Sequence, residues 1–260
     1  EGISKEAMSI AGKFGLNKLI VLYDSNDIQL DGAVSDVYNE KLEKEALAFS
    51  WNYILLEDGN DTDAILKAIK KAKKSDKPTI IEIKTTIGKH SALQGTNAVH
   101  GTPLTKDDIS GIKEKLKIRD VPFAISQNIS DDFRYIINSR CSNLTKEFES
   151  KLKTLSKEQH EELEYFMNDD KSINLKELFY EPPVDKTEEA VRITSSKLLN
   201  TIVPEFPYII GGSADLFAAN KTLIKEANAF SCDDYLGKNI YYGVREHAMG
   251  AILNGLALTG

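Results

Sequence analysis

Hydrophobic and polar residues alternate with two different periods in the first part of the chain. Apolar residues recur every three or four positions at 2–14, which predicts a helix, and the apolar run KLIVLYD (18–24) that follows is typical of a strand buried in a parallel sheet. The same cadence then predicts a helix at 40–49, a strand at 51–57, a helix at 61–74 and a strand at 79–85. Strands that alternate with helices form βαβ units, so we expect an α/β fold with a parallel sheet flanked by helices.

Polar loops follow each of the three predicted strands. They are SNDIQLDG (25–32), DGND (58–61) and the long loop TIGKHSALQGTNAVHGTP (86–103). Ligands in parallel α/β folds bind beyond the carboxyl ends of the strands. These loops are therefore where we expect a binding site.

The pattern changes after the first 120 residues. Residues 131–169 are helical and strongly charged, and the pair Pro182 and Pro183 interrupts them. Beyond it we expect a helix capped by Thr187 and a strand at 208–214. The predicted divisions are an α/β domain (1–120), a helical connector and linker (121–186) and the start of a second α/β domain (187–260), which has too few elements to close its own core.

Composition excludes several classes of protein. The net charge is −7 over 260 residues without a dense basic tract, which argues against a general nucleic-acid binder. No apolar run approaches the ~18 residues of a membrane span. Cys141 and Cys232 lie far apart without a CxxC, which predicts no zinc site and suits a reducing cytoplasm. The chain opens without Met on a helical pattern, so we expect a piece of a longer protein.

Several positions in the loops and helices carry candidate chemistry. Asn26 follows a buried strand, and its side-chain oxygen and the carbonyl of Ile28 would suit a hard cation, although an Asx turn explains the same residues. His100 is either a catalytic or a bystander histidine of its loop. Asp215 is either a site residue or a helix cap, and Arg192 either faces an anionic substrate or pairs with a carboxylate.

The final segment, YYGVREHAMGAILNGLALTG (241–260), places Glu246 at the start of a predicted helix. A helix dipole alone favours such a charge by roughly 0.3–1 kcal/mol. The helix is rich in small residues, and Ala251 and Gly255 fall on one face. We therefore expect close packing that holds Glu246 in a restricted place.

The sequences of these motifs and their order resemble those of the transketolase family over essentially the whole chain. The matching blocks are EGIS followed by an acidic residue, YDSNDIQLDG, KTTIG, GTNAVHG, GGSADL and YGVREHAMG. The resemblance implies a thiamine diphosphate-dependent enzyme of the pentose phosphate pathway that transfers a two-carbon ketol unit from a ketose phosphate to an aldose phosphate. It also implies a homodimer, in which the pyrophosphate-binding domain of one subunit (1–120) and the pyrimidine-binding domain of its partner (187–260) enclose each cofactor.

The resemblance assigns roles to residues of the first domain. It implies that Asn26 binds Mg²⁺ (or Ca²⁺) through its side chain, that Ile28 does so through its carbonyl, and that Leu30 lies near the thiazolium. His100 corresponds to a histidine that reaches the phosphate side of the cofactor and the substrate.

The resemblance also assigns roles in the second domain. Asp215 matches an aspartate near the partner's cofactor, and Arg192 matches an arginine that binds the sugar phosphate. Glu246 matches a buried glutamate that bonds the aminopyrimidine and so promotes removal of the C2 proton. Glu1 and Glu6 resemble acids that link the two active sites, although a first-turn helix charge would explain them too.

Three departures from the family pattern limit these expectations. The Gly-Asp-Gly that supplies another metal ligand should precede Glu1, and the aromatic residues that hold the pyrimidine should follow Gly260, so neither is in this chain. Ala219 replaces an expected serine, which would cost phosphate recognition about 0.5–1.5 kcal/mol. We therefore expect the 260-residue chain by itself to be inactive.

Other functions remain open at this point. Dihydroxyacetone synthase shares many of these motif sequences, whereas 1-deoxyxylulose-5-phosphate synthase fits the last motif, YGVREHAMG, less well. From another class, the chain could be a non-catalytic piece or an assembly module that keeps the fold without the chemistry.

Overall fold

The computed structural model describes residues 2–167, 188–206 and 208–259. Two compact units make up the chain, one formed by residues 1–104 with 181–260 and the other by residues 105–180. Among the described residues, no helix has the length and apolar character needed to cross a membrane.

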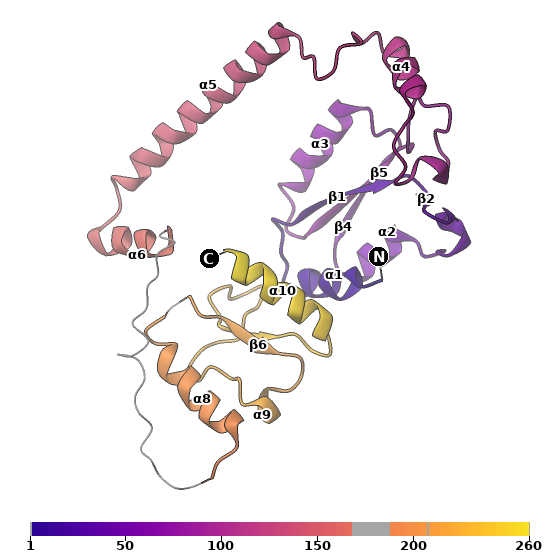
Figure 1. Cartoon of the computed structure of the whole chain (residues 1–260). Coiled ribbons are helices and arrows are strands. Elements are labelled where there is room, and N and C mark those ends of the chain that lie inside the picture. Colours follow the sequence, from indigo (N-terminus) through magenta and orange to yellow (C-terminus); the bar gives the residue numbers. More distant parts are fainter. Residues whose placement is uncertain (1, 168–187, 207, 260) are drawn as a thin grey trace. The chain divides into compact units, whose positions relative to one another are not determined.

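A three-stranded parallel sheet forms the centre of the first unit. Its strands are β1 (Ile20–Ser25), β5 (Thr79–Lys84) and β4 (Asn52–Leu56), in the order β1-β5-β4 (Figure 1). In this register Glu82 of β5 lies between Tyr23 of β1 and Leu55 of β4. The predicted α/β fold with a parallel sheet is confirmed, and the strand bounds differ from the predicted ones by at most two residues.

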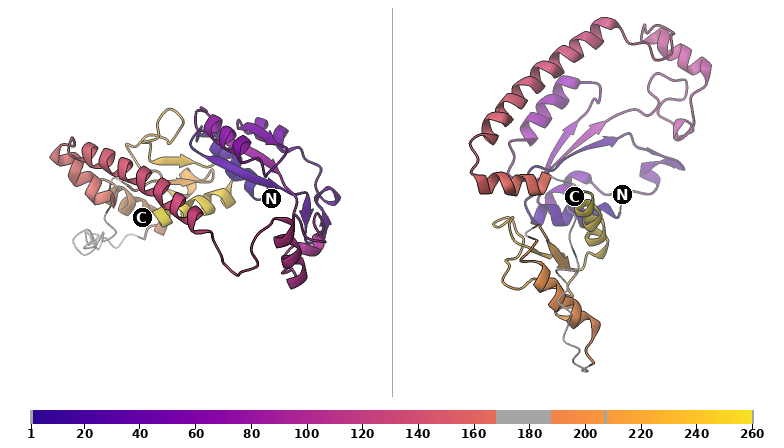
Figure 2. Two further views of the ribbon diagram at one scale, coloured as in Figure 1. Left: turned by 90° about the horizontal axis from the view of Figure 1, so that it is seen from above. Right: turned by 60° about the vertical axis from the view of Figure 1, so that its left-hand side comes forward.

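Helices cover both faces of this sheet (Figure 1, and the right-hand view of Figure 2). On one face, Ile80 packs in a cluster with Ala11 of α1 (Ser4–Lys13) and Ala46 of α2 (Leu42–Ala48). On the other, Ile81 packs against Ala68 of α3 (Thr62–Ala72). Successive strand residues point to opposite faces, so Ile80 and Ile81 bury the central strand β5 on both sides.

The C-terminal segment builds its core on α1. Its elements are α8 (Val191–Ile202), β6 (Gly211–Ser213), α9 (Phe217–Asn220), β7 (Asn239–Tyr241) and α10 (Glu246–Thr259), and β6 pairs with β7 in parallel. Ile10 of α1 and its C-cap residue Phe14 pack against Ala214, which follows β6, and Ile240 of β7. Helix α1 therefore contributes one face to each of two cores, which compensates for the few elements of this segment.

Two sequence predictions for this segment need correction. Helix α8 begins at Val191, and its N-cap is Ala190, three residues later than expected and without a capping side chain. Thr187 lies outside the described residues. The strand expected at 208–214 is only β6, because its pairing with β7 covers only Gly211–Ser213.

The second unit is helical. It contains α4 (Lys106–Lys115), α5 (Gln127–Leu152) and α6 (Lys157–Met167). The charged helical stretch predicted at 131–169 corresponds to α5 and α6 as far as the described residues extend. Helix α4 was not predicted, although Thr105 caps it by accepting the Asp108 N–H at 3.1 Å, a signal present in the sequence TKDD.

Candidate functional site

The turn after β1 has a defined geometry. The Asn26 side-chain oxygen accepts the N–H of Ile28 at 3.0 Å, which makes an Asx turn. Asp27, between them, adopts the left-handed conformation with φ of 61°. A short hairpin of β2 (Ile28–Gln29) and β3 (Gly32–Ala33) follows, so both predicted metal ligands stand at the carboxyl end of β1.

The long loop after β5 contacts this hairpin. The Asn97 side-chain amide donates to the Leu30 carbonyl at 3.1 Å. A Cβ on Gly101 would lie 3.7 Å from the Leu30 side chain, so the residue next to His100 is also in its neighbourhood. The structure therefore brings two blocks of the sequence, about seventy positions apart, together at Leu30.

His100 carries an unusual feature within this loop. Its Nδ1 atom is buried and has no hydrogen-bond partner in the described part of the chain. Buried polar atoms are nearly always hydrogen-bonded, so such an atom fits a ligand that would complete it. Asn26 and the Ile28 backbone add neutral oxygens of the kind that Mg²⁺ binds. This edge of the sheet thus fits a phosphorylated cofactor that carries a divalent cation.

Among the residues that the structure describes, no group of three or more His, Cys, Asp or Glu side chains could hold a metal ion. This agrees with a donor set built from an amide and a backbone carbonyl, to which further ligands would have to be added.

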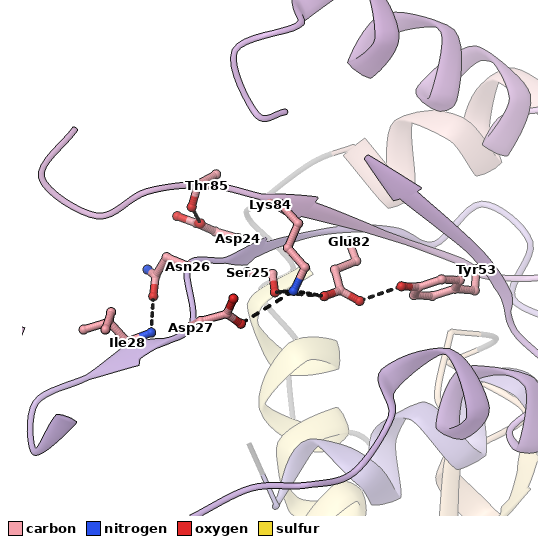
Figure 3. A network of polar contacts seen from close by, with 9 residues as sticks. All are labelled: Asp24, Ser25, Asn26, Asp27, Ile28, Tyr53, Glu82, Lys84 and Thr85. Carbon is pink, nitrogen blue, oxygen red and sulfur yellow. Dashed lines mark hydrogen bonds and ion pairs between the residues drawn. The ribbon is translucent and has the colours of Figure 1, made fainter. Parts of the chain in front are cut away.

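A polar network lies beside the turn and joins all three strands (Figure 3). The Glu82 carboxylate, on the central strand, accepts hydrogen bonds from the Tyr53 hydroxyl at 2.7 Å and the Ser25 hydroxyl at 2.8 Å. Lys84 lies 2.9 Å from the same carboxylate. Burial alone would raise the pKa of Glu82, but its hydrogen bonds outweigh burial and hold that pKa below the ordinary value.

Sequence reasoning missed this network. The available signal was the pair Glu82 and Lys84, two charged residues in the otherwise apolar strand TIIEIK. Charged residues are rarely buried without a partner, so this pair indicates a polar contact inside the fold. What the sequence could not give is the partner, because that depends on the register between strands.

The residues predicted in the C-terminal segment form a second group. Asp215 follows β6 in the left-handed conformation, with φ of 61°, and is exposed. It lines a cleft of about 640 Å³ together with Lys13, Tyr241 and Arg245. Arg245 donates to the Tyr242 carbonyl at 2.8 Å and to the Ser9 hydroxyl at 3.0 Å, which fixes the start of α10 against α1.

The burial that the family resemblance implies for Glu246 is not present in the single chain, and the role of this residue stays a prediction. Glu246 is the first residue of α10 and is exposed. Cβ atoms built on Gly250 and Gly255 would have no atom within 4 Å, so these two glycines make no close contact in the described part of the chain. Helix α10 packs instead through Ala248, Met249 and Ile252 and leaves Gly250, Ala251 and Gly255 exposed.

Glu6 contacts the helix that carries Glu246. Its carboxylate accepts the N–H of Ala248 at 2.9 Å, in the first turn of α10, where N–H groups lack helical partners. Glu1 lies outside the described residues. Arg192 is exposed at the start of α8, and Ala219 is exposed in α9.

The two groups of candidate residues are not joined within the chain. No hydrogen bond or ion pair of the described residues connects Asn26 or His100 to Asp215, Arg192 or Glu246. Asn26 bonds within its own turn, and the loop that carries His100 bonds the Leu30 carbonyl. Helix α10, which carries Glu246, bonds Glu6 of α1. A site that used both groups would need something to bring them together.

Comparisons with known proteins bear on both groups. Residues 1–172 match the family model "Transketolase, thiamine diphosphate binding domain", and residues 188–260 match "Transketolase, pyrimidine binding domain". The chain is 40% identical over 268 residues to the transketolase of Bacillus subtilis and 40% identical over 265 residues to a probable transketolase of Streptococcus pneumoniae. Each comparison covers all of this chain and 40% of the relative.

Solved structures give the same result. The transketolase of Pichia stipitis in complex with sedoheptulose-7-phosphate superposes with a TM-score of 0.92 at 36% identity. The transketolase of Leishmania mexicana superposes with a TM-score of 0.89 at 34% identity. All of this chain is covered in both, against 40% and 39% of those chains, so it spans about two fifths of the length of its relatives. With both family models matched along nearly its whole sequence, the chain belongs to the transketolase family.

Proposed function

We propose that the chain is part of a cytoplasmic transketolase of the pentose phosphate pathway. The protein would bind thiamine diphosphate with Mg²⁺ and transfer a two-carbon ketol unit from a ketose phosphate to an aldose phosphate. One observation carries the proposal: the Asn26 turn and the His100 loop meet at Leu30, at the carboxyl edge of a parallel sheet, in a chain of this family. The two exposed free cysteines, Cys141 and Cys232, suit the reducing cytoplasm.

The first group of residues, at the carboxyl edge of the sheet, would hold the phosphate end of the cofactor. It consists of Asn26, Ile28, Leu30 and His100. Asn26 and the Ile28 carbonyl would bind the cation, Leu30 would provide an apolar contact, and His100 would direct its buried nitrogen to a phosphate or substrate oxygen. When bound, thiamine diphosphate supplies the carbon that accepts and returns the two-carbon unit. The protein's task is to bind it, to orient it and to move a proton at its reactive carbon.

The second group would act on the cofactor of a partner subunit. Asp215 and Glu246 are exposed and, within the described ranges, make no hydrogen bond or ion pair with Asn26 or His100, which supports a homodimer with shared active sites. A second copy would bury Glu246 and so place its carboxyl group away from solvent, beside the cofactor of the partner subunit. Glu6, which caps α10, would then lie beside both the helix and the path between sites.

The activity itself is the direct test of this proposal. The 260-residue chain should show no ketol transfer, because the further metal ligand and the pyrimidine-holding aromatic residues are not in it. The longest natural form that contains the chain should transfer ketol units from xylulose 5-phosphate to ribose 5-phosphate in a coupled assay. Turnover by the 260-residue chain would contradict the roles given to those additional residues, and inactivity of the longest form with cofactor and Mg²⁺ would contradict the proposed function.

Arg192 gives a test of substrate recognition. If its guanidinium binds only the substrate phosphate, Arg192→Ala should raise the KM for phosphorylated acceptors by about ten- to hundredfold, the range of a charged hydrogen bond. The KM for glycolaldehyde, which carries no phosphate, should not change. Lys197→Ala, on the same helix and paired with Glu189 at 2.7 Å, is the matched control. Equal losses on both acceptors would make Arg192 a structural residue.

A further inference from the structure

Lys84 joins the rigid sheet to the turn that carries the predicted metal ligands. Its ammonium group lies 2.9 Å from Glu82 Oε1, donates to Ser25 Oγ at 2.9 Å and lies 3.5 Å from Asp27 Oδ1 (Figure 3). Two of these contacts are to strands, and the third is to the middle residue of the turn. Lys84 thus contacts the turn from a fixed position in the sheet.

The anchored end of this contact is the buried one. The Glu82 side chain is 11% exposed, whereas the Asp27 side chain is 75% exposed. An ion pair between two free surface side chains gains little, because both must be ordered to form it. Here Glu82 and Ser25 already order the Lys84 ammonium group. Only the Asp27 side chain must then be ordered to form the ion pair.

The backbone of Asp27 decides where the two predicted ligand oxygens lie. Its left-handed φ of 61° reverses the chain between Asn26 and Ile28. This conformation is disfavoured for a residue with a side chain, by roughly 1–2 kcal/mol. Contacts of the Asp27 side chain therefore help to keep the turn in the one arrangement that presents both oxygens.

We propose that Lys84, anchored by Glu82, is a positioning residue that holds the Asn26–Ile28 turn in its metal-binding geometry through Asp27. This rests on the proposed function, because it takes the turn as the site of the cation. Lys84 itself touches neither the cation nor the substrate.

The test measures binding of Mn²⁺ with thiamine diphosphate, by electron paramagnetic resonance, in the longest natural form of the protein. Lys84→Met should weaken Mn²⁺ binding about tenfold, at the lower end of the effect of outer-shell partners. Asp27→Asn should give a similar loss while leaving Glu82 and Lys84 paired, so it serves if Lys84→Met does not fold. The double variant should lose no more than either single one, because both remove the same contact. Lys84→Arg should retain most of the affinity.

A second readout reports on the turn itself. Hydrogen exchange at the Ile28 amide, which is bonded to Asn26, should quicken about two- to fivefold in Lys84→Met, as expected for a partly exposed ion pair. Tyr53→Phe removes a different hydrogen bond of Glu82, on the β4 side. It should lower the unfolding temperature without changing Mn²⁺ binding or Ile28 exchange.

The outcomes separate this proposal from the proposed function. If Asn26→Ala weakens Mn²⁺ binding while Lys84→Met and Asp27→Asn leave it unchanged, the positioning role is overturned and the metal turn stands. If Asn26→Ala itself has no effect, the turn is not the metal site and both proposals fail. Equal losses of Mn²⁺ affinity in Tyr53→Phe and Lys84→Met would reduce Lys84 to a general stabiliser of the sheet.

Discussion

Glu246→Gln should slow hydrogen–deuterium exchange at C2 of bound thiamine diphosphate by about 10²–10⁴-fold, the range of general acid–base catalysis. Gln has nearly the shape of Glu but cannot hold or give up a carboxyl proton, so the fold should be retained. A role of Glu246 confined to the helix dipole predicts a different result, a stability loss of about 0.3–1 kcal/mol with exchange preserved. Exchange monitored by NMR and thermal unfolding, on the longest natural form, measure both quantities.

The matched control for this variant is Glu43→Gln. Glu43 is an exposed acidic residue in the first turn of α2, so it shares the helix position of Glu246 without the proposed role. We expect it to lose a similar amount of stability and to leave C2 exchange unchanged. Similar exchange rates in the two variants would remove Glu246 from the proposed chemistry.

Asn26→Ala should weaken thiamine diphosphate binding and raise the Mg²⁺ concentration needed for it. The effect should be at least as large as the roughly 10- to 100-fold loss caused by removing an outer-shell partner, because Asn26 is proposed to contact the cation directly. Ala also removes the acceptor of the Ile28 N–H, so the second oxygen donor would lose its fixed place. Calorimetric titration of the cofactor over a series of Mg²⁺ concentrations measures both effects.

Asn60→Ala provides the comparison for Asn26→Ala. Asn60 stands in the turn after β4, where it bonds the Asp58 carboxylate through its N–H at 2.9 Å and its side chain at 2.8 Å. It is thus another asparagine at the carboxyl edge of the same sheet, with no proposed contact to the cofactor. Unchanged cofactor and Mg²⁺ affinity in Asn26→Ala, as in Asn60→Ala, would leave Asn26 as a turn former alone.

The sequence predicted the sheet well for a local reason. Strands of a parallel sheet are rich in apolar residues, and both KLIVLYD and TIIEIK show such runs. Of the two, the central strand β5 is buried almost throughout, whereas β1 lies at an edge and is partly exposed. Helix bounds were less accurate at α8, because its N-cap is Ala190 and carries no capping side chain to read. The short strand β6 was overestimated because its apolar neighbours pack in a core without pairing in the sheet.

The candidate site was predictable in its parts but not in its connections. The Asx turn at Asn26 follows from local chain chemistry, and the turn at 25–32 could be placed at a strand end from sequence. The contact between Leu30 and Asn97 could not, because it depends on how a long loop folds back. The Glu82 network required the register of three strands, which no local pattern specifies.

By itself, then, the sequence determined the alternation of helices and strands, the α/β class, the turn after β1 and the family to which the chain belongs. These features are encoded in the spacing of hydrophobic residues, in turn-forming residues and in short motif sequences, all of which involve a few neighbouring positions. Only the tertiary structure decided that α1 serves two cores, that Lys84 reaches Asp27 and that Glu246 is exposed in the single chain. Each of these depends on contacts between distant segments, whose free energy is set by packing and register and cannot be read from one segment alone.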